Sequence, residues 1–109
     1  MQLWYAPTSP FARKVRIALI ELGLQDAIEL VEVNPWTDGK LRALNPLAKV
    51  PTLVRDGAEP LYESGVICDY LNSLSGAGRL IPATGEARWQ ALLLQGLADG
   101  ACTAAAPRT

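Results

Sequence analysis

The chain has 109 residues, half of them hydrophobic, and its 10 basic and 11 acidic side chains leave a formal net charge of −1. This length builds one compact core and is too short for two complete domains. Because the charges are interspersed, the composition disfavours nucleic acid and an anionic membrane surface as partners.

Cysteine and histidine usage narrows the chemistry further. Cys68 and Cys102 are the only cysteines, and two such distant residues build neither a disulfide framework nor a metal cluster. The chain has no histidine, which removes the commonest general base and most zinc sites, so we expect no metal cofactor. The first residues lack the charged region of a signal peptide and no apolar run reaches membrane-spanning length, so we expect a cytoplasmic protein.

The first stretch, residues 3–23, predicts a strand, a turn and a helix. Ser9 is a favoured N-cap residue, Pro10 suits the first helical position, and Gly23 is a usual helix stop. A hydroxyl is thereby placed at the positive end of a helix dipole, where a neighbouring anion is stabilised. The same residues are also typical of a purely structural cap, and the pattern alone leaves both interpretations open.

The next segments predict a mixed sheet covered by helices. Asn45-Pro46 ends a short helix, Asp56-Gly57 is a strong hairpin signal, and Ser64 is expected to cap a third long helix. The expected strands after the first are 27–33, 52–55 and 59–62, and the short helix is 40–44. A parallel crossover followed by a hairpin gives an α/β fold with four strands, complete near residue 80.

The end of the chain predicts a linker and one more helix. Residues 75–86 are rich in glycine and proline, and the helical segment that follows is apolar around most of its circumference. Such a helix is normally buried, so we expect Trp89 to lie in a helix core. We therefore divide the chain into a domain at 1–80 and a linker with one helix at 81–109.

Two further segments are candidates for ligand binding. Val50-Pro51 precedes a strand, and a cis bond there would present the backbone of Val50 to an extended peptide, although a proline at a strand start is ordinary. Ser64 at a helix N-terminus suits a carboxylate and Glu63 suits an ammonium, although this pair is also typical of a simple capped helix. With Ser9, these segments are expected at neighbouring edges of one sheet, where ligands of α/β proteins bind.

At this point the chain resembles the N-terminal, thioredoxin-like domain of the glutathione S-transferases, of the type with a catalytic serine. The resemblance rests on YAPTSPFARKVRIALIELGL, NPLAKVPTLVRDG and LYESGVICDYL, which occur in the family's order and approximate spacing. It covers residues 1 to about 80. It implies a βαβαββα fold, glutathione as co-substrate, a small electrophile as second substrate, and a detoxification reaction.

The resemblance also implies roles for individual residues. The serine at the place of Ser9 donates a hydrogen bond to the glutathione sulfur and favours its thiolate, with Thr8 as the alternative hydroxyl. The valine at the place of Val50, before cis-Pro51, pairs with the cysteinyl backbone of glutathione. Glu63 and Ser64 hold the γ-glutamyl end. Lys40 and Lys49 are weaker candidates for the glycyl carboxylate and are also typical of solvated surface lysines. Phe11 completes the predicted glutathione site.

The chain departs from the family after residue 80. Family members carry a second, all-helical domain that supplies most of the electrophile pocket, and here only its first helix is recognisable. The apolar helix needs cover, and a homodimer is the simplest way to supply it. Besides a glutathione transferase, a non-catalytic association module and a glutathione-dependent isomerase remain open as functions.

Overall fold

The computed structural model describes residues 1–76 and 78–105. Residue 77 of the predicted linker and residues 106–109 of the predicted C-terminal segment lie outside the described residues. The elements follow the predicted order, including the helix after the linker. They are β1 (Gln2–Tyr5), α1 (Pro10–Glu21), β2 (Glu29–Glu32), α2 (Gly39–Leu44), β3 (Thr52–Val54), β4 (Leu61–Tyr62), α3 (Ser64–Leu74) and α4 (Gly85–Ala105).

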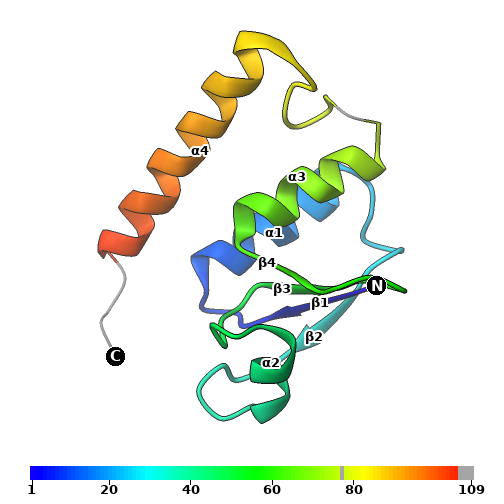
Figure 1. Cartoon of the computed structure of the whole chain (residues 1–109), viewed down its shortest axis with the longest axis vertical. Coiled ribbons are helices and arrows are strands. Elements are labelled where there is room, and N and C mark those ends of the chain that lie inside the picture. Colours follow the sequence, from blue (N-terminus) through cyan, green and yellow to red (C-terminus); the bar gives the residue numbers. More distant parts are fainter. Residues whose placement is uncertain (77, 106–109) are drawn as a thin grey trace.

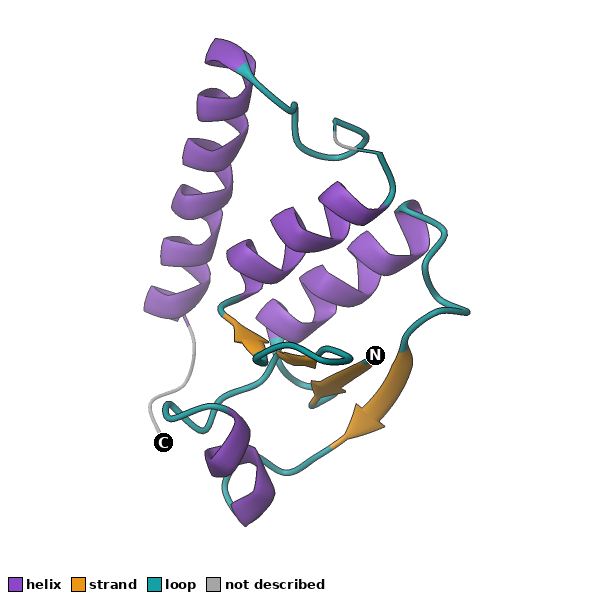
Figure 2. Ribbon diagram, turned by 45° about the vertical axis from the view of Figure 1, so that its right-hand side comes forward, coloured by secondary structure: helices purple, strands orange, loops and turns teal. Residues whose placement is uncertain are grey.

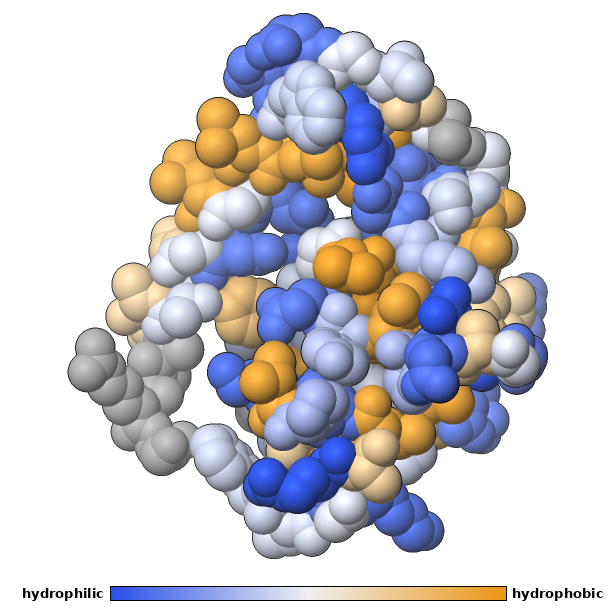
Figure 3. All heavy atoms as spheres, in the orientation of Figure 1, coloured by the Kyte–Doolittle hydropathy of each residue, from blue (hydrophilic) through white to orange (hydrophobic). Residues whose placement is uncertain are grey.

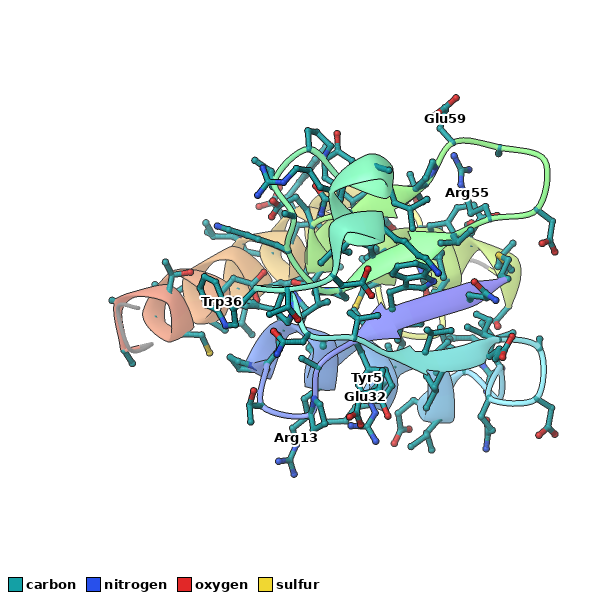
Figure 4. The ribbon with its side chains drawn as sticks, turned by 90° about the horizontal axis from the view of Figure 1, so that it is seen from below. Tyr5, Arg13, Glu32, Trp36, Arg55 and Glu59 are labelled. Carbon is teal, nitrogen blue, oxygen red and sulfur yellow. The ribbon has the colours of Figure 1, made fainter. Side chains whose placement is uncertain are left out.

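The four strands form one mixed sheet in the order β2-β1-β3-β4. β1 runs parallel to β2 and antiparallel to β3, and β3 runs antiparallel to β4. The hairpin between β3 and β4 turns at Gly57, which has a φ of +71°. Arg55 closes this turn by donating from Nε to the carbonyl oxygen of Glu59 at 2.8 Å (Figure 4). The predicted α/β fold with a four-stranded mixed sheet is confirmed.

The core lies between the sheet and two helices. α1 and α3 lie side by side on one face of the sheet, and α2 lies on the opposite side (Figures 1 and 2). Ten buried side chains from the strands, from α1 and α3 and from the segment after α1 form one cluster. Among them, Leu3 and Leu53 of neighbouring strands and Ile67 of α3 are fully buried. This packing fixes the ends of α1 and α3 relative to the sheet.

The start of α3 differs from the prediction that Ser64 caps the helix. Glu63 occupies the N-cap position with a φ of 71° and makes no side-chain capping hydrogen bond, and Ser64 is the first helical residue and is buried. The left-handed backbone at Glu63 shifts the helix start by one residue. Glu63 therefore keeps its carboxylate exposed while its carbonyl oxygen accepts from Ile67 N–H at 3.1 Å.

The prediction that Trp89 lies in a helix core is wrong, whereas the last helix does need cover, as its sequence predicts. α4 stands to one side of the sheet and its helices, and none of its residues from Gly85 to Ala105 is buried (Figure 1). Four of its large apolar side chains are 63–70% exposed, Trp89, Leu93, Leu94 and Leu97, and Leu92 is half-buried. The physical reason is that, in the described part of the chain, α4 meets α3 and a few side chains around Lys14, and its other sides face solvent. No helix in the described part is long and apolar enough to cross a membrane.

Candidate functional site

The first component of the site is the turn from β1 into α1. Ser9 has an extended backbone with a φ of −80°, and its Oγ accepts a hydrogen bond from Ala12 N–H at 3.1 Å, so the predicted N-cap is confirmed. Within the described residues, the Ser9 hydroxyl proton has no acceptor. The cap therefore fixes the oxygen and leaves the half-buried O–H available to a ligand atom.

The second component is the loop that leads into β3. The Val50-Pro51 bond is cis. Asn45 holds the loop, because its buried amide donates to the carbonyl oxygen of Lys49 at 3.1 Å and to Thr52 Oγ1 at 3.2 Å. Thr52 Oγ1 donates to the same carbonyl oxygen at 2.9 Å. Among the described residues, no hydrogen bond engages the backbone N–H or C=O of Val50, so both groups are available to an extended ligand.

The third component is the N-terminus of α3. The first intrahelical bond runs from Ile67 N–H to the carbonyl oxygen of Glu63. Within residues 1–76 and 78–105, no hydrogen bond engages the backbone N–H groups of Ser64, Gly65 or Val66. Free amides at a helix N-terminus favour an anion, and the exposed Glu63 carboxylate beside them favours a cation.

One small cavity connects the second and third components. It has a volume of about 160 Å³. Six of the eight predicted glutathione-binding residues line it: Phe11, Lys49, Val50, Pro51, Glu63 and Ser64. Three further residues complete the wall, Asn45 before the loop and Asp99 and Thr103 from α4. Phe11 belongs to the first turn of α1, so this turn also contributes to the wall.

Several candidates lie outside this wall. Ser9 is two residues from Phe11 but does not itself line the cavity, and Thr8 before it is exposed. Lys40 lies exposed on α2 and is not brought to the cavity. Trp36, which is not among the predicted site residues, is 75% exposed in the loop before α2 and does not line the cavity. Figure 4 shows Trp36 well separated from the hairpin turn that carries Arg55.

The charges of the wall suit a ligand with charges of both signs. Lys49 contributes an ammonium group, and Glu63 and Asp99 contribute carboxylates. Both oxygens of Asp99 lie 3.0 Å from Lys14 Nζ, which approaches from α1. Asp99 is thus held by an ion pair at the junction of α1 and α4.

Backbone strain also marks this region. Ala48, with a φ of 52°, and Glu63, with a φ of 71°, are the non-glycine residues with positive φ in the described part of the chain. Each directly precedes a residue that lines the cavity, Lys49 and Ser64. Left-handed backbone at non-glycine residues costs about 1–2 kcal/mol and concentrates at functional sites.

Cys68 is not placed for nucleophilic chemistry. It is buried on α3, and burial raises the pKa of its thiol to about 11, with nearby Lys14 acting in the opposite direction. A thiol with so high a pKa stays protonated near neutral pH. Among the described residues, no three His, Cys, Asp or Glu side chains lie close enough to hold a metal ion.

A larger and more open hollow separates α3 from α4. Its volume is about 930 Å³, and its wall includes Val66 and Tyr70 of α3 and Leu92 and Gln95 of α4. The space-filling view shows this hollow between α4 and the rest of the molecule, beside apolar side chains of the helix (Figure 3). Glu63 and Asp99 belong to the walls of both cavities, so the hollow adjoins the smaller site.

Comparison with known proteins places the chain in a family. Residues 8–74 match the family described as Glutathione S-transferase, N-terminal domain. The GST-like protein YibF of Escherichia coli K12 is 33% identical over 101 residues, which are 92% of this chain and 49% of that protein. Glutathione S-transferase 2 of Saccharomyces cerevisiae is 30% identical over 89 residues, which are 77% of this chain and 38% of that protein. The chain thus spans half or less of the length of these curated relatives.

Solved structures agree in fold. A glutathione transferase family member from Pseudomonas fluorescens Pf-5, with bound glutathione, superposes with a TM-score of 0.83 and 41% identity over 91% of this chain and 50% of that one. A glutathione S-transferase from Methylobacillus flagellatus KT, with glutathione bound, superposes with a TM-score of 0.85 and 36% identity over 95% and 51% of the two chains. The sequence match and the shared fold together show that this chain belongs to the glutathione S-transferase family, through its N-terminal, thioredoxin-like domain.

Proposed function

We propose that this chain binds glutathione in the 160 Å³ cavity and activates the glutathione thiol for conjugation to an electrophile. The observation that carries the proposal is the convergence of six predicted residues from three separate segments on one small cavity. Two relatives of the same fold were crystallised with glutathione bound, which supports the same ligand for this chain. We assign residues 1–80 as the glutathione-binding domain and residues 81–109 as a linker and the first helix of a second domain, of which Asp99 and Thr103 reach the cavity wall.

The γ-glutamyl end of glutathione carries an ammonium and a carboxylate on one carbon. In our proposal the carboxylate accepts from the free amides and the hydroxyl at Ser64, at the positive end of the α3 dipole. The ammonium lies between the carboxylates of Glu63 and Asp99. Charge-assisted hydrogen bonds of both signs at one end of the cavity would fix the direction of the tripeptide.

The cysteinyl residue of glutathione would then lie along Val50. The free N–H and C=O of Val50 can pair with its backbone as a neighbouring strand would. The sulfur would point towards the N-terminus of α1, and the Lys49 ammonium would be available to the glycyl carboxylate. Lys40, on α2 away from the cavity, is the weaker candidate for that carboxylate.

Ser9 would activate the thiol without a general base. A free thiol has a pKa of about 8.5 and is mostly protonated at neutral pH. The Ser9 oxygen already accepts from Ala12 N–H, so its proton can be donated to the sulfur, and the α1 dipole adds to the stabilisation of the thiolate. Lowering the thiol pKa by about 1.5 units requires about 2 kcal/mol, which these two effects can supply.

The test is a titration of glutathione bound to the full chain, followed by the ultraviolet absorbance of the thiolate. We expect the thiol pKa to fall by about 1.5 units on binding to the wild-type chain and by at most a few tenths in Ser9→Ala. Thr8→Ala is the matched control, since it removes the neighbouring exposed hydroxyl and should leave the shift unchanged. Binding without any shift, or an equal shift in Ser9→Ala, would refute activation by Ser9.

A second function is favoured by the exposed apolar side chains of α4. We propose that, if glutathione binding is retained without thiol activation, the chain serves as an association module whose α4 pairs with a second copy in a homodimer. Sedimentation equilibrium would show a dimer that Leu93→Glu dissociates. Retention on immobilised glutathione, lost in Glu63→Ala, would show in the same preparation that the ligand site is used.

A further inference from the structure

α4 is tied to the rest of the chain by two ion pairs. Near its start, the Arg88 guanidinium binds the Asp69 carboxylate of α3 in a bidentate pair, with N···O distances of 2.6 and 3.2 Å. Near its end, the Lys14 ammonium of α1 binds both oxygens of Asp99 at 3.0 Å. All four side chains are 24–34% exposed, so both pairs are partly shielded from solvent.

Little else holds the C-terminal half of α4 in place. None of its residues is buried, and its leucines 93, 94 and 97 are 67–70% exposed. The helix approaches α3 at Gly65, where an added Cβ would lie 3.3 Å from the side-chain amide of Gln95. Arg88 and Asp99 are eleven positions apart, which is about 16 Å along a helix. The pair at Arg88 therefore does not by itself fix the far end of α4.

That far end forms part of the proposed glutathione site. Asp99 and Thr103 lie one helical turn apart and line the 160 Å³ cavity together with Lys49 and Val50. Lys14 does not line the cavity and contacts it through Asp99.

We propose that Lys14 is a positioning residue that holds Asp99, and with it the C-terminal half of α4, against the cavity and so sets the affinity for glutathione. The proposal rests on the function proposed above. A ligand that contacts both Glu63 and Asp99 bridges the α/β unit and α4, so ligand binding and the closed position of α4 favour each other. Loss of the Lys14–Asp99 pair lowers the closed population and thereby the apparent affinity.

Labelling of Cys68 can report the position of α4 without any bound ligand. It is buried on α3 and is close enough to Lys14, Asp99 and Asp69 for their charges to act on its thiol. Because Asp99 of α4 is among the charges that reach this thiol, we expect departure of α4 to increase its exposure. In a Cys102→Ser background the exposed cysteine is removed, so maleimide labelling measured by mass spectrometry reports Cys68.

The experiment compares Lys14→Met, Lys14→Arg and Arg88→Met in that background. Affinity is measured by calorimetry with S-methylglutathione, which has no thiol to react with the maleimide. We expect Lys14→Met to weaken binding about fivefold, the effect of losing a partly shielded ion pair. Cys68 labelling should accelerate, because the gain in exposure outweighs the rise in the thiol pKa that follows loss of the Lys14 charge. Lys14→Arg should restore both values to within about twofold of wild type, because it keeps the charge.

Arg88→Met separates positioning from a general loosening of the helix. It removes an ion pair of the same kind but leaves Asp99 in contact with Lys14, so binding should change by less than about twofold. The Lys14→Asp, Asp99→Lys double variant should regain slow Cys68 labelling, because the pair is reformed with reversed charges.

Each outcome decides a different point. If Lys14→Met binds S-methylglutathione as tightly as wild type, the positioning role is refuted while the proposed function stands. If the wild-type chain does not bind S-methylglutathione, the proposed function fails and the affinity role fails with it. Unchanged Cys68 labelling in Lys14→Met without ligand refutes the part of the proposal that places α4 under the control of Lys14.

Discussion

The α/β unit and α4 are held in place by different forces. The sheet, α1 and α3 share a cluster of ten buried side chains, whereas α4 has no buried residue among Gly85–Ala105 and is tied by two ion pairs. Burying one large apolar side chain contributes about 2 kcal/mol, and a partly exposed ion pair contributes about 1 kcal/mol or less. The fold is thus stabilised by its core, whereas the position of α4 depends on charge.

The largest difference in the free energy of unfolding is expected between alanine variants of a leucine in the core and a leucine in α4. Leu53→Ala should lower the free energy of unfolding by about 3 kcal/mol, because Leu53 is fully buried and its removal leaves a cavity. Leu93→Ala removes the same atoms from a side chain that is 68% exposed and should cost less than about 0.5 kcal/mol. Urea unfolding followed by circular dichroism measures both values. Similar losses in the two variants would show that α4 is packed as tightly as the core.

A smaller effect on the free energy of unfolding is expected from ionisation of the Cys68 thiol, which lies near both regions. The pKa of Cys68 is raised from its ordinary value of 9.0 to about 11 by burial. Below pH 9 the thiol is protonated in both states, and its stabilising contribution is fully present. Between pH 9 and pH 11 the unfolded chain loses the proton first, so this contribution is lost as pH rises, by about 2 kcal/mol at pH 10.5.

The measurement is the free energy of unfolding at several pH values for wild type and Cys68→Ala. The variant lacks the thiol, so the difference between the two pH profiles isolates Cys68 from lysines and tyrosines that also titrate there. We expect the wild-type profile to fall more steeply above pH 9. Parallel profiles would show that Cys68 is not shielded in the folded chain.

The smallest expected effect is that of salt on amide hydrogen exchange in α4. Raising ionic strength from 0.1 to 1 M shortens the screening length from about 10 to about 3 Å, which weakens the pairs Lys14–Asp99 and Arg88–Asp69. A helix released from tertiary contacts frays, so amide hydrogen exchange in α4 should accelerate by about twofold while exchange in α1 and α3 stays unchanged. Equal responses of the three helices would mean that α4 is held by more than charge.

Local signals in the sequence predicted most of the α/β unit. Ser9-Pro10 marks the start of α1, Asp56-Gly57 marks the hairpin, and Asn45-Pro46 marks the end of α2, and the structure has all three features. Each signal depends on the preference of one or two residues for a turn or a cap, which acts within a few positions along the chain. Six predicted binding residues meet at one cavity because the α/β fold brings together the start of α1, the loop before β3 and the start of α3.

Three features could not be predicted, for physical reasons. The cap of α3 is Glu63 in a left-handed conformation, which the sequence rule favouring Ser64 does not anticipate. The exposure of Trp89 depends on which side of α4 faces the rest of the chain, which hydrophobic periodicity does not determine for a helix that is apolar on most sides. Lys14 and Asp99 are 85 positions apart, so their contact and the place of Asp99 in the cavity wall follow only from the tertiary structure.

The two edge strands of the sheet disfavour edge-to-edge association of folded chains at high concentration. β4 has two residues, which is too short to serve as a template for another strand. β2, at the other end of the sheet, begins with Glu29 and ends with Glu32. A second β2 added antiparallel in the symmetric register would place Glu29 opposite Glu32 twice, and this repulsion protects the chain against edge-to-edge aggregation and fibril growth.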